Sequence, residues 1–211
     1  MDIIERILEE KLGDIVTDTQ LKILFHEMSD NQRYGVVKRA LANGRLIRIR
    51  RGLYCLNERY RKKALNLFEL AEKVYGPSYI SFESALAYHG WIPEAVYTVS
   101  SACIKQSRTF DTPVGVFSYS KVPPDDFFLN VERVSDSSGV FFMATPGKAL
   151  LDLIAVRKKT WDNISQLSDD LRIEKDNLLK VPPEEWQKMS TRFGNKSTQN
   201  FINQLEKEFR G

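Results

Sequence analysis

The stretch Arg45-Leu46-Ile47-Arg48-Ile49-Arg50-Arg51-Gly52-Leu53-Tyr54-Cys55-Leu56 decides the fold of the N-terminal part of the chain. Isoleucines alternate with arginines before Arg51-Gly52, and four residues that favour strands follow. Alternation with a period of two is typical of a strand, and glycine between two such runs is typical of a tight turn. The stretch therefore predicts a two-stranded hairpin with basic residues on one face and at its tip.

Three short helices are predicted before this hairpin. The first is expected from the helical spacing of apolar residues between Ile3 and Leu12. The second begins after Thr17 or Asp18, either of which can cap it. The third begins after Ser29, and its buried stripe is expected to contain Tyr34, Val37, Ala40 and Leu41. Three helices followed by a basic hairpin indicate a winged helix-turn-helix in residues 1–60, whose third helix would enter the major groove of DNA.

Charge is distributed unevenly along the 211 residues. The formal net charge is only +3, but residues 31–63 contain eleven basic residues and a single acidic one, Glu58. Such a segment favours a polyanionic partner, although a solvated basic face would give the same count. Arginine and lysine neutralise phosphates, whereas Asn and Gln side chains read base edges. We expect the DNA-contacting residues to be Asn31, Gln32, Arg33, Lys38, Arg39, Arg48, Arg50 and Arg51.

The rest of the chain predicts a mixed α/β domain, residues 61–160, and a helical extension, residues 161–211. An amphipathic helix is expected over Ala64–Tyr75, and the pair Thr145-Pro146 is a typical helix start. Four strands are expected between these helices, at Val96–Ile104, Val114–Lys121, Phe127–Val134 and Val140–Ala144. The expected fold class of the whole chain is thus α+β.

No group of residues predicts a catalytic centre. Gly147-Lys148 lacks the first glycine and the Ser/Thr of a phosphate-binding loop. Two histidines and two isolated cysteines cannot supply a standard zinc set. Pro124-Asp125 is not followed by the acid-x-Lys element of a nuclease, and no nucleophile elbow surrounds Ser84. We expect no enzymatic activity, no metal and no cofactor.

The sequence also bears on location. No apolar run approaches the ~20 residues of a membrane span. Asp2 and Glu5 stand where a secretory signal would carry positive charge. Cys55 and Cys103 are far apart and have no CxxC partner, which favours a reducing compartment. We expect a cytoplasmic protein without membrane contact.

Three segments together resemble the AbiEi-type antitoxins. Gly44–Tyr54 is similar to the "GxLxRxxRGxY" hairpin of that family. Tyr79–Gly90, which reads YISFESALAYHG, is similar to the segment that follows the hairpin, and Ala144–Leu153, which reads ATPGKALLDL, resembles a later family segment. The three occur in the family's order and cover roughly residues 15 to 160, whereas the tail after Trp161 matches nothing in it.

The resemblance implies a regulator of a bacterial type IV toxin–antitoxin, or phage-defence, operon. Its winged helix would bind double-stranded DNA, namely the repeats of its own promoter, as a monomer or a homodimer. Its C-terminal domain would counteract a nucleotidyltransferase-like toxin encoded nearby, with or without direct contact. The surface expected to carry this antitoxicity comprises basic positions predicted to be exposed: Lys105, Arg108, Lys148, Arg157, Lys158 and Lys159.

Two other functions fit the same sequence. The first is a stand-alone DNA-binding regulator without a toxin, whose second domain senses a ligand or dimerises. The second is an enzyme, such as a nuclease-like body joined to a winged helix, and it ranks lowest because no catalytic group is apparent.

Overall fold

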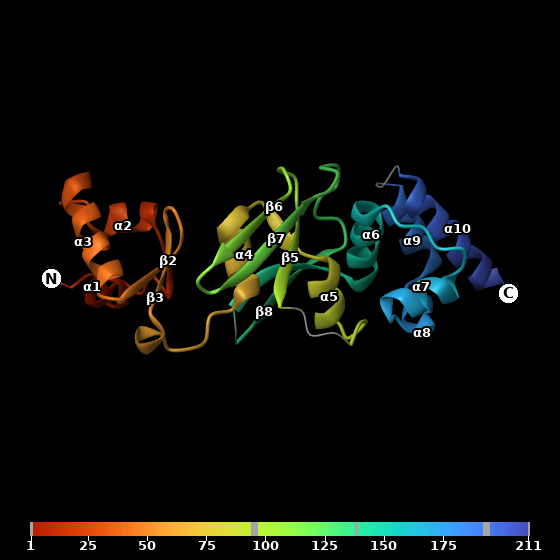
Figure 1. The fold of residues 1–211 in the computed structure, drawn as a ribbon, viewed down its shortest axis with the longest axis horizontal. Coiled ribbons are helices and arrows are strands. Elements are labelled where there is room, and N and C mark those ends of the chain that lie inside the picture. The colour runs from red at the N-terminus through yellow and green to blue at the C-terminus, as the bar shows by residue number, and fades with distance from the viewer. Residues whose placement is uncertain (1, 94–96, 138, 192–194, 211) are drawn as a thin grey trace.

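A computed structural model of the chain describes residues 2–93, 97–137, 139–191 and 195–210. The described residues form a mixed α+β protein with two sheets, which confirms the expected fold class. The molecule is elongated, and its two termini lie at opposite ends of the longest axis (Figure 1). A small helical and β unit, a central sheet and a bundle of helices follow one another along this axis.

The N-terminal unit contains three helices and a three-stranded sheet. The sheet is antiparallel, in the order β1-β3-β2. Thr17 caps the second helix and Ser29 caps the third, which confirms the starts that the sequence predicted. Each cap also forms a capping box with a glutamine three residues later. The elements are α1 (Ile3–Glu9), β1 (Ile15–Thr17), α2 (Asp18–Leu24), α3 (Asp30–Ala42), β2 (Leu46–Arg50) and β3 (Leu53–Leu56).

The predicted hairpin is present, but both of its faces contain buried side chains. The register shifts between Arg48 and Arg50, so the regular alternation is broken there. On one face Leu46, Tyr54 and Leu56 pack in a core with the three helices. On the other face Ile49, Leu53 and Cys55 belong to the core of the central sheet. The expectation of one basic face is therefore wrong for this hairpin, whose second face is an internal contact of the molecule.

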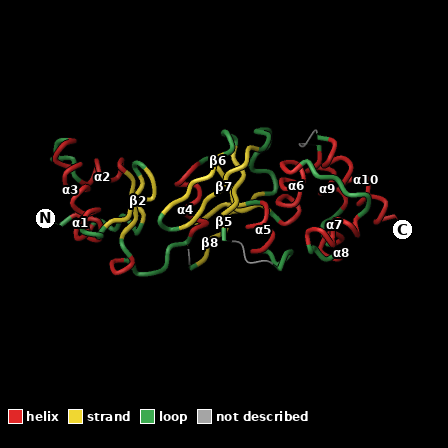
Figure 2. The backbone as a smooth tube through the Cα atoms, viewed as in Figure 1, coloured by secondary structure: helices red, strands yellow, loops and turns green. Residues whose placement is uncertain are grey.

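A short connection joins the N-terminal unit to the rest. It consists of the 3-10 turn η1 (Glu58–Tyr60) and a loop over residues 61–66, drawn in green in Figure 2. Asn66 caps the next helix, α4 (Leu67–Tyr75), so this helix starts three residues later than expected. The domain division near residue 60 coincides with this connection and stays a prediction, since the two parts share buried apolar residues.

The central sheet has six strands in the order β6-β7-β5-β4-β9-β8. Helix α4 packs against β4, β5, β7 and β9, and α5 packs against β5. The strand expected at Phe127–Val134 starts later, and the strands β4 and β6 were not expected. Val96 and Ser138 lie outside the described residues. The elements are β4 (Ser78–Ile80), α5 (Phe82–Tyr88), β5 (Thr98–Cys103), β6 (Arg108–Thr112), β7 (Gly115–Lys121), β8 (Val131–Asp136) and β9 (Gly139–Ala144).

Helix α6 (Pro146–Arg157) is enclosed between the sheet layer and the C-terminal helices. Eight consecutive residues, Gly147 to Ile154, are buried. A side chain at Gly147 would meet Met189 at 3.1 Å, so glycine lets the tail approach α6 closely. The tail comprises α7 (Ile164–Leu171), α8 (Lys175–Leu179), α9 (Pro183–Ser190) and α10 (Lys196–Arg210), and its apolar residues join the central core.

Candidate nucleic-acid interface

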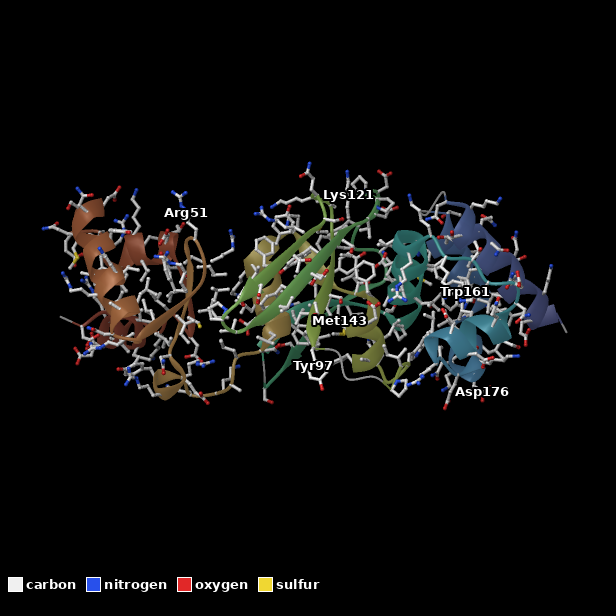
Figure 3. The ribbon with its side chains drawn as sticks, in the orientation of Figure 1. Arg51, Tyr97, Lys121, Met143, Trp161 and Asp176 are labelled. Atoms are coloured by element: carbon white, nitrogen blue, oxygen red, sulfur yellow. The ribbon has the colours of Figure 1, made fainter. Side chains whose placement is uncertain are left out.

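A groove of about 590 Å³ separates the first half of α3 from the β2–β3 hairpin. Its walls combine basic, acidic and aromatic side chains, and Arg51 stands at the outer tip of the hairpin (Figure 3). The residues that line the groove are up to 36 positions apart in the chain. Its lining residues are Asp18, Asp30, Asn31, Arg33, Tyr34, Val37, Arg48, Arg51 and Tyr54.

The start of α3 fixes the side chain of Gln32. The Gln32 amide oxygen accepts hydrogen bonds from the Ser29 backbone N–H at 2.9 Å and from the Ser29 hydroxyl at 2.9 Å. The Gln32 backbone N–H in turn donates to the Ser29 hydroxyl at 3.4 Å. Gln32 was expected to read a base edge, but its acceptor atom is engaged in capping its own helix.

The neighbours of Gln32 are less constrained. Tyr34 was expected in the buried stripe of α3, but 63% of its surface is exposed, so that expectation is wrong. It lies at the margin of the stripe that Val37 and Ala40 bury, beside the groove. Asn31 is exposed, and its side chain makes no hydrogen bond to any described residue.

The six basic residues expected to contact DNA fall into two groups. Lys38 and Arg39 on α3, and Arg48 and Arg51 on the hairpin, are exposed and form no ion pair with the acidic residues of the described ranges. Cations without a local partner are available to neutralise phosphates.

The other two basic residues are engaged within the protein. The guanidinium of Arg33 donates to Asp30 at 2.9 Å. The guanidinium of Arg50 donates to the backbone carbonyl of Lys73, at the end of α4, at 3.4 Å. Arg50 therefore points toward the central sheet unit, unlike its neighbour Arg51 at the tip.

Two acidic residues also line the groove. Both precede residue 31, so they were not part of the charge count over residues 31–63. Asp30 pairs with Arg33, and Asp18 lies beside the hairpin turn, where its backbone N–H donates to the carbonyl of Gly52 at 3.0 Å. Burial and the carboxylate of Asp18 raise the pKa of Tyr54. The place of Asp18 at the start of α2 is readable from the sequence, whereas its proximity to the hairpin depends on the pairing of β1 with β3.

The residues expected to form one antitoxicity surface do not all lie at the surface. Lys148 is 6% exposed and belongs to the core, so its predicted exposure is wrong. The exposed members are engaged locally: Lys105 lies over the ring of Tyr75, and Arg157 pairs with Glu83. Lys159 pairs with Asp170 at 2.6 Å, Arg108 lies over the ring of Phe110, and Lys158 ends α6 in the left-handed conformation.

Lys148 instead forms a buried polar cluster with three residues of the segments Tyr79–Gly90 and Ala144–Leu153. Its ammonium group lies 2.5 Å from Asp152 Oδ1 and 2.7 Å from the hydroxyl of Tyr79. The hydroxyls of Tyr79 and Ser81 donate to Asp152 Oδ2 at 3.0 and 2.7 Å. Burial and the charge of Asp152 raise the pKa of Tyr79 well above its ordinary value. The cluster joins β4 and the residue after it to α6, and all four of its members are buried.

Other candidate chemistry is sparse in the described part of the chain. No group of three or more His, Cys, Asp or Glu there could hold a metal ion. Cys55 and Cys103 are free and buried, and burial raises the pKa of both thiols. His89 ends α5, and its Nε2 lies 3.0 Å from the carbonyl oxygen of Ala144. None of the described helices has both the length and the apolar character that crossing a membrane requires.

Comparison of the chain with models of protein families gives no match, and comparison with curated proteins gives no significant match. The resemblance to AbiEi-type antitoxins thus stays a prediction from the three segments.

Proposed function

We propose that this protein is a double-stranded DNA-binding regulator whose N-terminal unit acts as a winged helix-turn-helix. The order α1-β1-α2-α3-β2-β3, with β1 paired to β3, supports this proposal. In that arrangement α3 enters the major groove, and the β2–β3 hairpin follows the backbone.

The observation that carries the proposal is the distribution of free cations. Lys38 and Arg39 on α3 and Arg48 and Arg51 on the hairpin lie on the two elements that would flank DNA, and they have no acidic partner among the described residues. A protein–protein module would not need four uncompensated cations in this arrangement, whereas each phosphate contact uses one.

The test is a mobility-shift titration with the duplex immediately upstream of the gene, at several salt concentrations. We expect specific binding that exceeds binding to an unrelated duplex of the same length and weakens steeply with salt. Equal binding to both duplexes at near-physiological salt would contradict a specific repressor.

We further propose, from the resemblance alone, that the regulator is the antitoxin of a type IV toxin–antitoxin operon. The central sheet unit and tail would counteract a nucleotidyltransferase-like toxin, and Lys148 would serve the fold rather than the antitoxic surface. Co-expression with each neighbouring gene, scored by growth, tests this. Protection by residues 64–211 supports the antitoxin role, whereas the absence of a toxic neighbour favours a stand-alone regulator.

An enzymatic function ranks below both. The most polar buried group, the Lys148 cluster, has its hydrogen bonds satisfied internally and borders a space of only about 10 Å³. We expect neither nucleic-acid cleavage nor nucleotide hydrolysis from the purified protein. Turnover that disappears on replacing Asp125, Asp152 or His89 would overturn this expectation.

A further inference from the structure

The outward face of α3 has an unusual residue at its centre. Because successive residues on an α-helix are 100° apart, Asn31, Gly35, Lys38 and Ala42 form one stripe, with Tyr34 beside it. Gln32 and Arg39 lie about a quarter turn away. Gly35 is the sixth of thirteen residues of α3, where glycine is the least favourable residue after proline.

Nothing inside the described protein explains this glycine. The backbone of Gly35 is ordinary helix, not the left-handed conformation that favours glycine. A Cβ built at Gly35 would meet only one atom within 4 Å, the Nη1 of Arg39 at 3.9 Å, which is the movable end of a flexible side chain. Alanine would therefore fit and would favour the helix. A glycine at this position allows another molecule to approach the helix backbone closely.

The polar residues around Gly35 are placed to read that molecule. Asn31 and Tyr34 are exposed and make no side-chain hydrogen bond to the described residues, while Lys38 carries an unpaired charge. An asparagine side chain offers one acceptor and two donors, which is the pattern that pairs with an adenine edge. Gln32, by contrast, is held by Ser29.

We propose that Asn31, Tyr34 and Gly35 form the base-reading edge of α3, and that Gly35 lets the helix backbone seat closely in the major groove. Gln32 is then a capping residue without a role in sequence choice. This inference rests on the DNA-binding function proposed above and names the residues that determine its specificity.

Gly35→Ala provides the sharpest test, because it separates folding from recognition. Alanine should raise the Tm of the full-length protein by about 2 °C, the effect of better helix propensity in a chain of this size. It should also weaken binding to the preferred duplex by ~10-fold or more, the scale of one lost base contact. A variant that is more stable and binds less tightly cannot be explained by misfolding.

The readout is selection from a pool of duplexes with randomised sequence, followed by titration of the selected duplex. We expect Asn31→Ala and Tyr34→Ala to change the selected sequence. Gln32→Ala, the matched control one position along, should lower the Tm but select the same sequence as the wild type. Lys38→Ala should weaken binding to all duplexes and flatten the salt dependence without changing selection.

The outcomes distinguish a failure of DNA binding from a failure of the proposed reading edge. If the wild-type protein retains no duplex even at low salt, the DNA-binding function itself is wrong, and this inference fails with it. If the wild type selects a sequence and the Asn31→Ala, Tyr34→Ala and Gly35→Ala variants select it with unchanged affinity, DNA binding stands and the reading edge is wrong. If Gln32→Ala is the variant that changes the selected sequence and the others do not, Gln32 is the base-reading residue.

Discussion

Lys148 and Asp152 face each other one turn apart on α6, with 2.5 Å between the ammonium nitrogen and the nearer carboxylate oxygen. Asp152 is fully buried, and its second oxygen accepts hydrogen bonds from the hydroxyls of Tyr79 and Ser81. A buried charge is costly unless it is paired and hydrogen-bonded, so each member of this cluster depends on the others. The cluster fixes α6 to β4 and the residue that follows it, in the middle of the molecule.

The first prediction concerns this pair. Asp152→Ala leaves the Lys148 ammonium buried without a counter-charge and should lower the free energy of unfolding by about 3–5 kcal/mol. The double variant Lys148→Met with Asp152→Leu removes both charges and should cost clearly less than Asp152→Ala alone. Urea denaturation of the three proteins measures the difference. A double variant as unstable as Asp152→Ala, or more so, would show that the unpaired buried charge is not the source of the effect.

The second prediction separates two neighbouring arginines. Arg51→Ala should flatten the plot of log affinity against log salt by about 0.9, because one phosphate contact is lost. Arg50→Ala should leave that slope unchanged, since its guanidinium donates to the carbonyl of Lys73 in the protein itself. Titrations with one duplex at several salt concentrations measure both slopes. Equal flattening by the two substitutions would mean that Arg50 leaves α4 to reach the DNA.

The third prediction concerns a fragment of residues 1–63. In the full chain Ile49, Leu53 and Cys55 are 4%, 2% and 0% exposed, and they pack with the central core. The fragment would expose this apolar face, so it should unfold at a lower temperature than the full chain and bind a hydrophobic dye. It should still bind DNA, more weakly. Replacing Ile49 and Leu53 of the fragment with threonine should reduce dye binding, and a fragment as stable as the full chain would refute the shared core.

The fourth prediction is a pH dependence at the junction of α6 with the tail. Hydrogen bonds from Lys159 and from the indole N–H of Trp161 lower the pKa of Asp170. A carboxyl with a lowered folded-state pKa stabilises the protein above its unfolded pKa, and this contribution disappears as pH falls through the folded value. Asp170→Asn should therefore lower stability near pH 6, by less than about 1 kcal/mol for so exposed a pair, and should have little effect near pH 2.

The pH dependence of Asp170→Asn is checked by measuring the free energy of unfolding of the wild type and the variant between pH 6 and pH 2. Asp169→Asn is the matched control, since Asp169 forms no ion pair with the described residues. A difference between wild type and Asp170→Asn that does not narrow on acidification would contradict the assigned cause.

Local signals in the sequence predicted the helix starts and the hairpin well. Thr17, Ser29 and Thr145 each precede a helix in the structure, because caps and turns depend on a few adjacent residues. Strands β1 and β4 have three residues each, too few to show a period, and they exist because neighbouring strands pair with them. Strand β6 is a mostly polar edge strand, so it lacks the apolar alternation that reveals a strand.

The candidate site was predicted less completely, because it depends on tertiary contacts. Tyr34 was assigned to the core from helical spacing, but spacing does not show where a buried stripe ends. Lys148 was assigned to the surface from its charge, but α6 is covered on opposite sides and Lys148 forms an ion pair with Asp152 within the core. The engagement of Arg50 with α4 joins residues 23 positions apart, which no local pattern reveals.

The enclosure of α6 has a consequence for how the protein is made. Its side facing α9 and α10 is covered by residues such as Trp186 and Phe201, which leave the ribosome well after α6 itself. At roughly 5–20 residues per second, Leu205 is added several seconds after the end of α6, so α6 is made before its cover is complete. Until the tail packs onto it, this side of α6 is uncovered apolar surface, and a pause in translation over the tail would prolong its exposure to aggregation.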